Sequence, residues 1–466
     1  MKTHFITGVN VPTLDQVFGV SASTVLSYVE RNSVDSSFTA AMAADKQIVV
    51  YGASKQGKTA LVQRHLPYES NIIVRLTPKT EIADAYRSIL RQAGITIQEG
   101  HSTERSGEAS IKGKAGFKAL IPIFGGAEAS TEIGAKGGTV ASKDFTEVPF
   151  NLELPQDISE LLAQAKISKT IILENFHYLS DKKQRQFAFD LRTFQELGIR
   201  FVILGVWKER NRLAQFNGDL LDRIHEVPVE PWLDKDFDRV VEKGEHELNI
   251  SFDTGLKASI KAASFSSIGV YQELLKQTCA LSGITKTAES LTPVDPQRFA
   301  EAKSNKAEDY STRHERALEA IATGNISGGG RGDAVPLFLP YYLVRVLCGE
   351  GFAGLATGMR RPTIQERIQA IHHRPDDVRA SDMSNLLHNL GALQASKNIS
   401  PPIVDYNQGL KLLQVVDSTF YFFLRNGDLP SFLDGLSNPV DDYKAKLAAN
   451  VQQVLSAGDD GGITME

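Results

Sequence analysis

The chain has 466 residues, a formal net charge of −5, 42% hydrophobic residues and 8% aromatic residues. This apolar content excludes a disordered protein, a collagen-like fibre and a small disulfide-rich scaffold. The slightly acidic balance excludes a uniformly basic nucleic-acid coat, although a local basic surface is still allowed. At roughly 100–200 residues per domain, the length predicts two to four domains.

Cysteine usage and hydropathy indicate the compartment. Cys279 and Cys348 lie far apart and have no metal-type spacing, so we expect buried thiols in a reducing compartment. The first residues contain no apolar stretch of the secretory kind. The longest apolar run, 334–348, is interrupted by two prolines and is too short to span a bilayer. We therefore expect a cytoplasmic protein that does not insert into a membrane.

From residue 35 to residue 229 the predicted strands and helices alternate. Apolar strands separated by amphipathic helices are typical of a parallel sheet that is covered on both faces. We expect Thr80 to cap one of these helices. The predicted strands are 47–51, 71–76, 170–173, 200–204 and 225–229, and the predicted helices are 35–44, 80–92, 157–165 and 181–197.

After Pro231 the pattern changes. Residues 234–282 show helical periodicity without a strand, and 285–297 and 325–333 resemble linkers. Further on, the order helix, helix, β-hairpin is typical of a winged helix. Its predicted elements are helices at 337–348, 363–372 and 381–395, strands at 403–405 and 411–416, and a buried aromatic segment at 413–426.

The sharpest motif follows the first strand and precedes a helix. It reads Gly52-Ala53-Ser54-Lys55-Gln56-Gly57-Lys58-Thr59, a full match to G-x-x-x-x-G-K-[ST]. Glycines let the backbone approach phosphate groups, and the amides at the helix start favour an anion. We therefore predict that these eight residues bind ATP, with Lys58 on the phosphates and the Thr59 hydroxyl on Mg²⁺.

A second part of the site is expected about 115 residues downstream, on the strand that ends at Glu174. In a P-loop ATPase we expect this strand to lie beside the strand before the phosphate loop, and its acid to hold Mg²⁺. The next residue, where a catalytic acid is common, is Asn175. Since an amide cannot accept a proton at neutral pH, we expect slow hydrolysis of ATP, or participation of Asp181 through water.

The phosphate loop, the run IILENFHYL, the strand RFVILGVW and the segment LLDRI together resemble the AAA+/STAND class of P-loop ATPases, over roughly residues 25–285. The origin-recognition-like and transposon-ATPase-like branches are the most similar. The resemblance places Arg223 where such families put an arginine that reaches a neighbouring subunit's nucleotide. It also places His177 near the phosphates, with a packed or capping histidine as the alternative.

Other positions depart from that family's pattern. Gly205, Val206 and Trp207 offer no sensor hydroxyl or amide, although Asn211 is nearby, and Tyr271 stands where a second sensor arginine is common. These departures favour a nucleotide switch over a fast ATPase. The predicted boundaries are an N-terminal segment (1–46), a P-loop core (47–233) with an insertion (100–148), a helical lid (234–290), a linker (291–333), a winged-helix-like domain (334–440) and a tail (441–466).

The insertion is rich in glycine, with nine glycines between residues 100 and 138. Within 110–138 the pattern alternates with period two and predicts an antiparallel hairpin that pairs Lys118 with Glu128 and Lys114 with Glu132. An isolated hairpin is marginally stable, so we expect a partner. A disordered loop is the alternative.

The winged-helix-like domain could contact DNA or protein. Its candidate recognition helix contains no lysine or arginine, so phosphate attraction there is weak. Basic residues gather before it, at Arg360, Arg361, Arg367, Arg374 and Arg379. Our hypothesis is therefore a homo-oligomeric ATP switch with a protein partner, of a kind that acts in antiphage defence. The alternative is a DNA-binding regulator or loader of the origin or transposition type.

Overall fold

The computed structural model describes residues 11–20, 25–99, 117–122, 145–324 and 335–459. Their contacts define two compact units. One, the sheet unit, contains residues 30–52 and 57–229. The other, the helical unit, contains residues 1–29, 53–56 and 230–466.

A parallel sheet of five strands forms the centre of the sheet unit, in the order β2-β6-β7-β1-β8. The predicted alternation of strand and helix is therefore confirmed. One expectation is wrong: β7 lies between β1 and β6, so the strand that carries Glu174 does not neighbour the strand before the phosphate loop. The bounds are β1 Gln47–Gly52, β2 Ile72–Arg75, β6 Ile171–Glu174, β7 Phe201–Val206 and β8 Ile224–Pro228.

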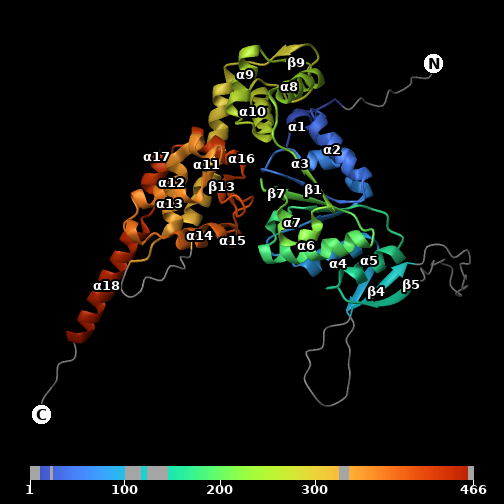
Figure 1. Cartoon of the computed structure of the whole chain (residues 1–466). Helices are drawn as coiled ribbons and strands as arrows, with labels where there is room; N and C mark the ends of the chain where they lie inside the picture. Colours follow the sequence, from blue (N-terminus) through green and yellow to red (C-terminus); the bar gives the residue numbers. More distant parts are fainter. Residues whose placement is uncertain (1–10, 21–24, 100–116, 123–144, 325–334, 460–466) are drawn as a thin grey trace, which may run out of the picture. The chain divides into compact units, whose positions relative to one another are not determined.

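Helices cover both faces of this sheet (Figure 1). Alternate strand residues point to opposite faces, so Ile48 and Val50 pack under α2 and α3, while Val49 and Tyr51 join the core on the other side. The fully buried strands explain why the sequence shows continuous apolar runs here. The covering helices are α2 (Asn32–Ala43) and α3 (Lys58–His65) on one face, and α4 (Ile82–Gln92), α5 (Pro155–Gln164) and α6 (Asp181–Glu196) on the other.

Helix α4 begins two residues after the predicted cap. Glu81 is its N-cap residue, and the Asp84 carboxylate accepts the Glu81 N–H at 3.3 Å in a reciprocal capping box. The hydroxyl of Thr80 instead accepts a hydrogen bond from the N–H of Thr77 at 2.9 Å. A better cap one residue later therefore displaced the predicted one. The short elements of this unit are η1 (Tyr68–Ser70), η2 (Phe176–Tyr178), α7 (Arg212–Phe216) and η3 (Gly218–Leu220).

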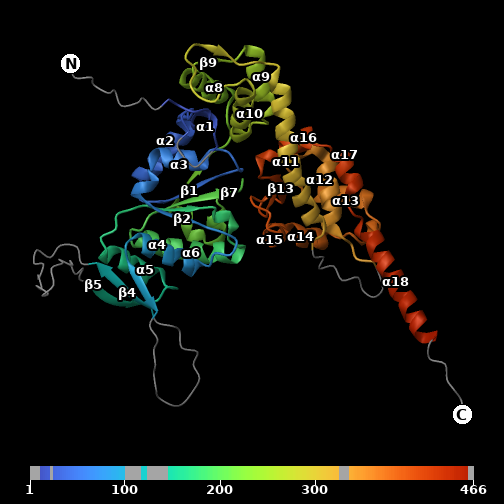
Figure 2. The same ribbon diagram turned by 180° about the vertical axis from the view of Figure 1, so that it is seen from behind.

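A second, antiparallel sheet has the order β3-β4-β5 and lies beside α5 (Figure 2). Its strands are Thr96–Glu99, Phe117–Pro122 and Phe145–Phe150. Lys118 lies opposite Gln98 on one side and Pro149 on the other, and its ammonium pairs with Glu147. Because both edges of β4 are taken, the predicted pairing of Lys118 with Glu128 does not hold. The rest of the predicted hairpin, including Lys114 and Glu132, lies outside the described residues.

The first part of the helical unit packs α1, α8, α9 and α10 around one core. A two-residue parallel pair, β9 with β10, lies where the sequence predicted helices and a linker alone. It forms because Asn249 ends α8 in the left-handed conformation, with φ 52°, and lets the chain turn. The bounds are α1 Leu14–Phe18, α8 Asp234–Leu248, β9 Ile250–Ser251, α9 Thr254–Ala263, α10 Ile268–Leu281 and β10 Thr292–Pro293.

Residues 298–322, within the segment predicted to be a linker, form the helix α11 (Arg298–Ala322). Tyr310, His314 and Leu318 are spaced four residues apart and are all buried. Ten of the 25 residues of this helix are charged and seven are buried, so its apolar stripe is narrow and easily missed in the sequence.

The C-terminal part has the order helix, strand, three helices and two strands, with an antiparallel sheet β11-β13-β12, and the single helix predicted at 381–395 is divided at Asn389 into two. The helices and strands predicted there are present, and the short β11 is an addition. The aromatic segment forms a buried helix, as expected. The bounds are α12 Leu339–Leu355, β11 Met359–Arg360, α13 Arg361–Ile371, η4 Pro375–Asp377, α14 Ala380–His388, α15 Leu390–Ser396, β12 Val404–Asn407, β13 Leu412–Val415, α16 Ser418–Asn426, α17 Leu429–Gly435 and α18 Pro439–Asp459.

Both cysteines are free and buried, as the sequence indicated. Burial raises the pKa of Cys279 and of Cys348 to about 12, so neither thiol is reactive at neutral pH. Among the described residues, no helix combines the length and the apolar content that crossing a membrane requires.

Candidate functional site

The phosphate loop connects β1 to α3, as the motif predicted. Gly57 precedes α3 with φ 84°, a left-handed conformation that glycine adopts without strain. The N-cap residue Gly57 has no side chain to cap α3, and the amides at the start of a helix favour an anion. The Lys58 ammonium donates to the carbonyl of Gly52 at 3.0 Å. The loop therefore has the backbone and the cation that phosphate binding needs.

Glu174 ends β6 and is buried, with 8% exposure. The Tyr68 hydroxyl donates to one carboxylate oxygen at 2.6 Å, and the Arg75 Nε donates to the other at 2.9 Å. Burial, and then the hydrogen bond to Glu174, raise the pKa of Tyr68. Each carboxylate oxygen keeps a second lone pair. Glu174 is thus a fixed carboxylate that can serve as a ligand of Mg²⁺.

Asn175 adopts the left-handed conformation, with φ 62° and ψ 35°, directly before η2. Asparagine tolerates this conformation better than most residues that carry a Cβ atom. The local backbone therefore gives a structural reason for an amide at the position where a catalytic acid is common. Its amide supplies no general base.

We expect that the substitution Asn175→Glu does not supply a working general base at this position. Glutamate in this turn costs about 1 kcal/mol of backbone strain, so the carboxylate would be poorly held. Any ATP hydrolysis by the wild-type chain should change by no more than about twofold in the variant, and the melting temperature should fall by a few degrees. Asn175→Gly, which relieves the same conformation, is the control and should keep its melting temperature. A large gain in hydrolysis by the glutamate variant would contradict this account.

Directly after β7, where the sequence resemblance leads us to expect a sensor side chain, the chain carries the indole ring of Trp207. Trp207 is fully buried and stacks on Tyr51, with ring centroids 6.4 Å apart. A Cβ atom at Gly205 would lie 1.7 Å from the Trp207 ring. The ring therefore excludes a side chain at Gly205. Asn211 caps α7 with φ 57°, and its N–H donates to Glu226 at 2.7 Å.

Arg223 lies at the other end of the sheet from the phosphate loop. Its carbonyl accepts the N–H of Gln47, the first residue of β1, whereas the loop follows the last residue of that strand. Its guanidinium contacts Gln195 at 2.5 Å and Glu196 at 3.1 Å. Strands of this length separate the two ends by about 16 Å. Arg223 therefore does not act on the phosphate loop of its own chain.

Residues 53–56 of the loop make their contacts within the helical unit, which sequence reasoning missed. The Ser54 hydroxyl donates to the Asp417 carboxylate at 2.8 Å, and the Ser54 N–H donates to the Val416 carbonyl at 2.7 Å. The Ser418 hydroxyl donates to the Ser54 carbonyl at 2.8 Å. The start of α16 thus holds Ser54 through three hydrogen bonds.

Asp417 is the centre of this contact and is 1% exposed. It pairs with Arg313 of α11 and accepts from the N–H of Thr419 at 3.1 Å. Burial acts to raise the pKa of Asp417, but the charges of His314 and Arg313 and the hydrogen bonds outweigh it, so this pKa lies below its usual value. Asp417 is therefore a charged, fully partnered carboxylate.

The start of α10 contacts the same loop segment. The Gly269 N–H donates to the Lys55 carbonyl at 2.9 Å, and a Cβ atom at Gly269 would lie 2.5 Å from the Lys55 side chain. Two other residues add contacts: the Trp232 indole N–H donates to the Gln56 carbonyl at 3.3 Å, and the Ala53 N–H donates to Glu230 at 2.5 Å. Tyr271, in contrast, is fully buried against Phe237 in the core that α8 and α10 share.

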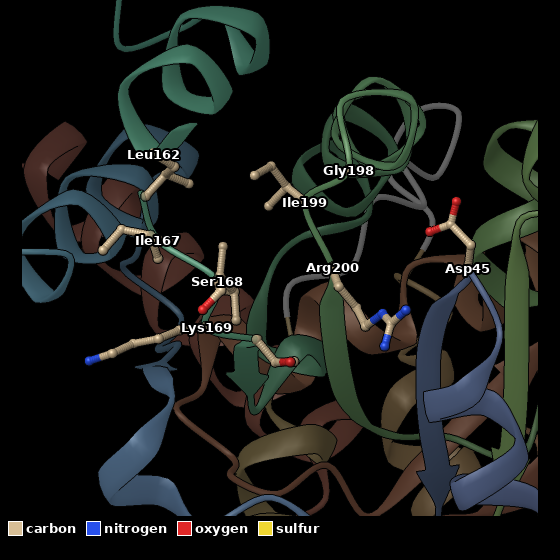
Figure 3. A pocket seen from close by; sticks show the side chains of 10 residues that line it. Asp45, Leu162, Ile167, Ser168, Lys169, Gly198, Ile199 and Arg200 are labelled. Carbon is tan, nitrogen blue, oxygen red and sulfur yellow. The ribbon is translucent and has the colours of Figure 1, made fainter. Parts of the chain in front are cut away.

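A pocket of about 180 Å³ lies at the amino ends of β6 and β7, away from the phosphate loop (Figure 3). Leu162 and Ile167 lie on one side of it, and Arg200 and Asp45 on the other. The Arg200 guanidinium donates to the carbonyls of Met42 and Ala44 at 2.7 and 2.9 Å, so it serves the packing of α2. This pocket is separate from the phosphate loop.

No family model and no curated protein matches this chain. Among solved structures, it is similar to a Walker-type ATPase of Pyrococcus abyssi (12% identity, 86% of this chain and 100% of that chain, TM-score 0.42). It is also similar to the Orc1 protein of Aeropyrum pernix, solved in complex with DNA (12% identity, 92% of this chain and 100% of that chain, TM-score 0.42). A third similar structure is Cdc6p from Pyrobaculum aerophilum (10% identity, 92% of this chain and 100% of that chain, TM-score 0.36). Because these identities and TM-scores are low, the function is argued below from the residues of this chain and not from these similar structures.

Proposed function

We propose that this chain is an AAA+-type P-loop ATPase that works as a nucleotide-dependent switch. The observation that carries the proposal is that one loop has the features of a phosphate-binding loop and also makes the hydrogen bonds that join it to the start of α16. The segment from Gly52 to Thr59 has the sequence and the backbone of a phosphate-binding loop, and Ser54 within it is held by α16. Phosphate binding that reshapes this loop would therefore strain the contacts of Ser54.

ATP with Mg²⁺ is the ligand that these residues fit. The uncapped amides of α3 and Lys58 would hold the phosphates, and Thr59 with Glu174 would hold the metal ion. The bound nucleotide supplies a phosphoanhydride whose cleavage can reset the switch. Because Asn175 is no base and Trp207 fills the sensor position, we propose that hydrolysis is slow.

We further propose that the region from α12 to β13 is a winged helix with a protein partner. Its order of helices and strands, with a three-stranded antiparallel sheet, supports this assignment. Three of the arginines considered for DNA are engaged within the domain, which disfavours DNA as the partner. Arg361 donates to Ser384 at 2.6 Å, Arg367 pairs with Glu350 at 2.6 Å, and Arg374 pairs with Asp377 at 2.6 Å.

Oligomerisation is part of the same proposal. Arg223 lies far from the phosphate loop of its own chain, so it could contact a nucleotide only if that nucleotide is bound to a second copy of this chain. Its carboxylate partner Glu196 is 44% exposed, so the pair can open at low cost. We place this cytoplasmic, STAND-like switch in antiphage defence. DNA loading of the origin or transposition type is the alternative, and the neighbouring genes would distinguish the two pathways.

Lys58→Ala tests the proposed function. We expect affinity for ATP to fall by roughly two orders of magnitude, because the variant lacks the charge-assisted hydrogen bond that we propose between the Lys58 ammonium and the phosphates. Calorimetry measures the affinity, and light scattering with ADP and with a non-hydrolysable ATP analogue measures assembly. Lys169→Ala, at an exposed lysine near the amino end of β6, is the matched control. Unchanged binding and unchanged assembly in Lys58→Ala would refute the proposal.

A further inference from the structure

His177 has hydrogen-bonding groups that the described structure leaves unused. Both ring nitrogens are shielded from solvent, and neither has a hydrogen-bond partner. A buried polar atom without a partner costs about 1–3 kcal/mol, so native proteins retain few of them. Such a group needs a partner from outside the chain, and that partner is a water, an ion or a bound ligand.

The position of His177 indicates which ligand. β6 ends at Glu174, the left-handed Asn175 turns the chain, and His177 follows in η2. The ammonium of Lys58 and the guanidinium of Arg212 are close enough to act on the imidazole. The ring therefore lies within electrostatic range of the lysine of the phosphate loop and three residues after the acid expected to bind Mg²⁺.

The imidazole is neutral at physiological pH. Burial, followed by the charges of Lys58 and Arg212, lowers the pKa of His177 to about 3. A neutral ring has one N–H donor and one acceptor nitrogen. Arg212 is less suited to a ligand, because its guanidinium already contacts Gln184 at 3.3 Å and Asp181 at 3.6 Å and lies over Trp207.

We propose that His177 donates a ring N–H to the terminal phosphate of a bound nucleoside triphosphate and so distinguishes it from a diphosphate. The inference rests on the proposed nucleotide binding and adds a specificity-determining residue to that site. A neutral donor contributes a hydrogen bond to an anion without adding charge beside Lys58. The hydrogen bond from this ring would then make the protein bind a triphosphate more tightly than a diphosphate.

His177→Phe is the test variant, because it keeps a ring of similar shape and removes both nitrogens. Calorimetry with ADP and with a non-hydrolysable ATP analogue gives the two affinities. We expect the analogue to bind roughly tenfold more weakly, with ADP binding unchanged. The ligand-free melting temperature should stay equal or rise, because two unsatisfied polar atoms are gone. His177→Leu serves as a second variant if the larger ring perturbs folding.

Two further variants sharpen the result. His177→Gln returns a neutral N–H donor and should recover part of the preference for the triphosphate. His225→Phe is the matched control, because His225 is half-buried in β8 and contacts Ser37 at 3.1 Å near the amino end of the sheet. It should leave both affinities unchanged.

The outcomes separate the two proposals. If the wild-type chain binds neither nucleotide, the proposed function fails and this inference fails with it. If the wild-type chain binds both nucleotides and His177→Phe keeps the wild-type preference, only the role of His177 is wrong. Equal weakening of both nucleotides would show that the ring has a structural role instead.

Discussion

Asp417→Ala is expected to destabilise the helical unit by about 3 kcal/mol. The substitution leaves the Arg313 guanidinium without its carboxylate and removes the acceptor of the Ser54 hydroxyl. Breaking a buried ion pair costs about 3–5 kcal/mol. We expect the lower end, since the Arg313 side chain is 34% exposed and can gain water. Thermal unfolding followed by circular dichroism measures the effect.

Hydrogen exchange gives a local measurement of the same change. The amide of Ser54 donates to Val416, next to Asp417, so it should exchange faster in Asp417→Ala. Asp417→Asn keeps an acceptor for Ser54 and Thr419 and should lose less stability. Adding Arg313→Leu to Asp417→Ala should recover part of the loss, because the unpaired charge is removed. An unchanged melting temperature in Asp417→Ala would contradict the role assigned to this carboxylate.

Gly205→Ala is expected to destabilise the sheet unit by about 3 kcal/mol or more. Its Cβ atom would overlap the Trp207 ring, which is fully buried and cannot shift without moving Tyr51 and Phe176. Overpacking of a core forces neighbours out of their preferred rotamers. The fluorescence of Trp207 should shift to longer wavelength as the ring gains contact with water.

Gly218→Ala is the matched control for this prediction. A Cβ atom at Gly218 meets nothing within 4 Å, so the variant should match the wild type. Combining Gly205→Ala with Trp207→Leu should cost less than the sum of the two single changes, because the overlap is gone. A Gly205→Ala variant with wild-type stability would show that the Trp207 ring does not exclude a side chain at position 205.

The sequence predicted correctly that the motif 52–59 lies between a strand and a helix, because its signal is local. The motif, the preceding strand and the following helix lie within one short segment, and both glycines needed for the loop are visible there. The apolar runs likewise predicted the strands, because each is buried on both faces. Period-two and helical patterns contain this information directly.

Other features depend on contacts that no pattern reveals. Ser54 and Asp417 are 363 residues apart in the sequence, and nothing near either residue indicates the other. The order of strands was misjudged because β7, which follows β6 in the chain, enters between β6 and β1. The segment now seen as α11 was read as a linker, because its charged positions outnumber its buried ones.

The pairing of β4 with β5 also has a consequence for protein engineering. Pro122 and Phe145 lie directly opposite each other, so the backbone on either side of residues 123–144 is held about 5 Å apart. The entropic cost of closing a loop across fixed ends grows slowly, by about 0.6 kcal/mol for each doubling of its length. Lengthening the chain between these two fixed ends by engineered insertion should therefore cost the β4–β5 pair little additional free energy.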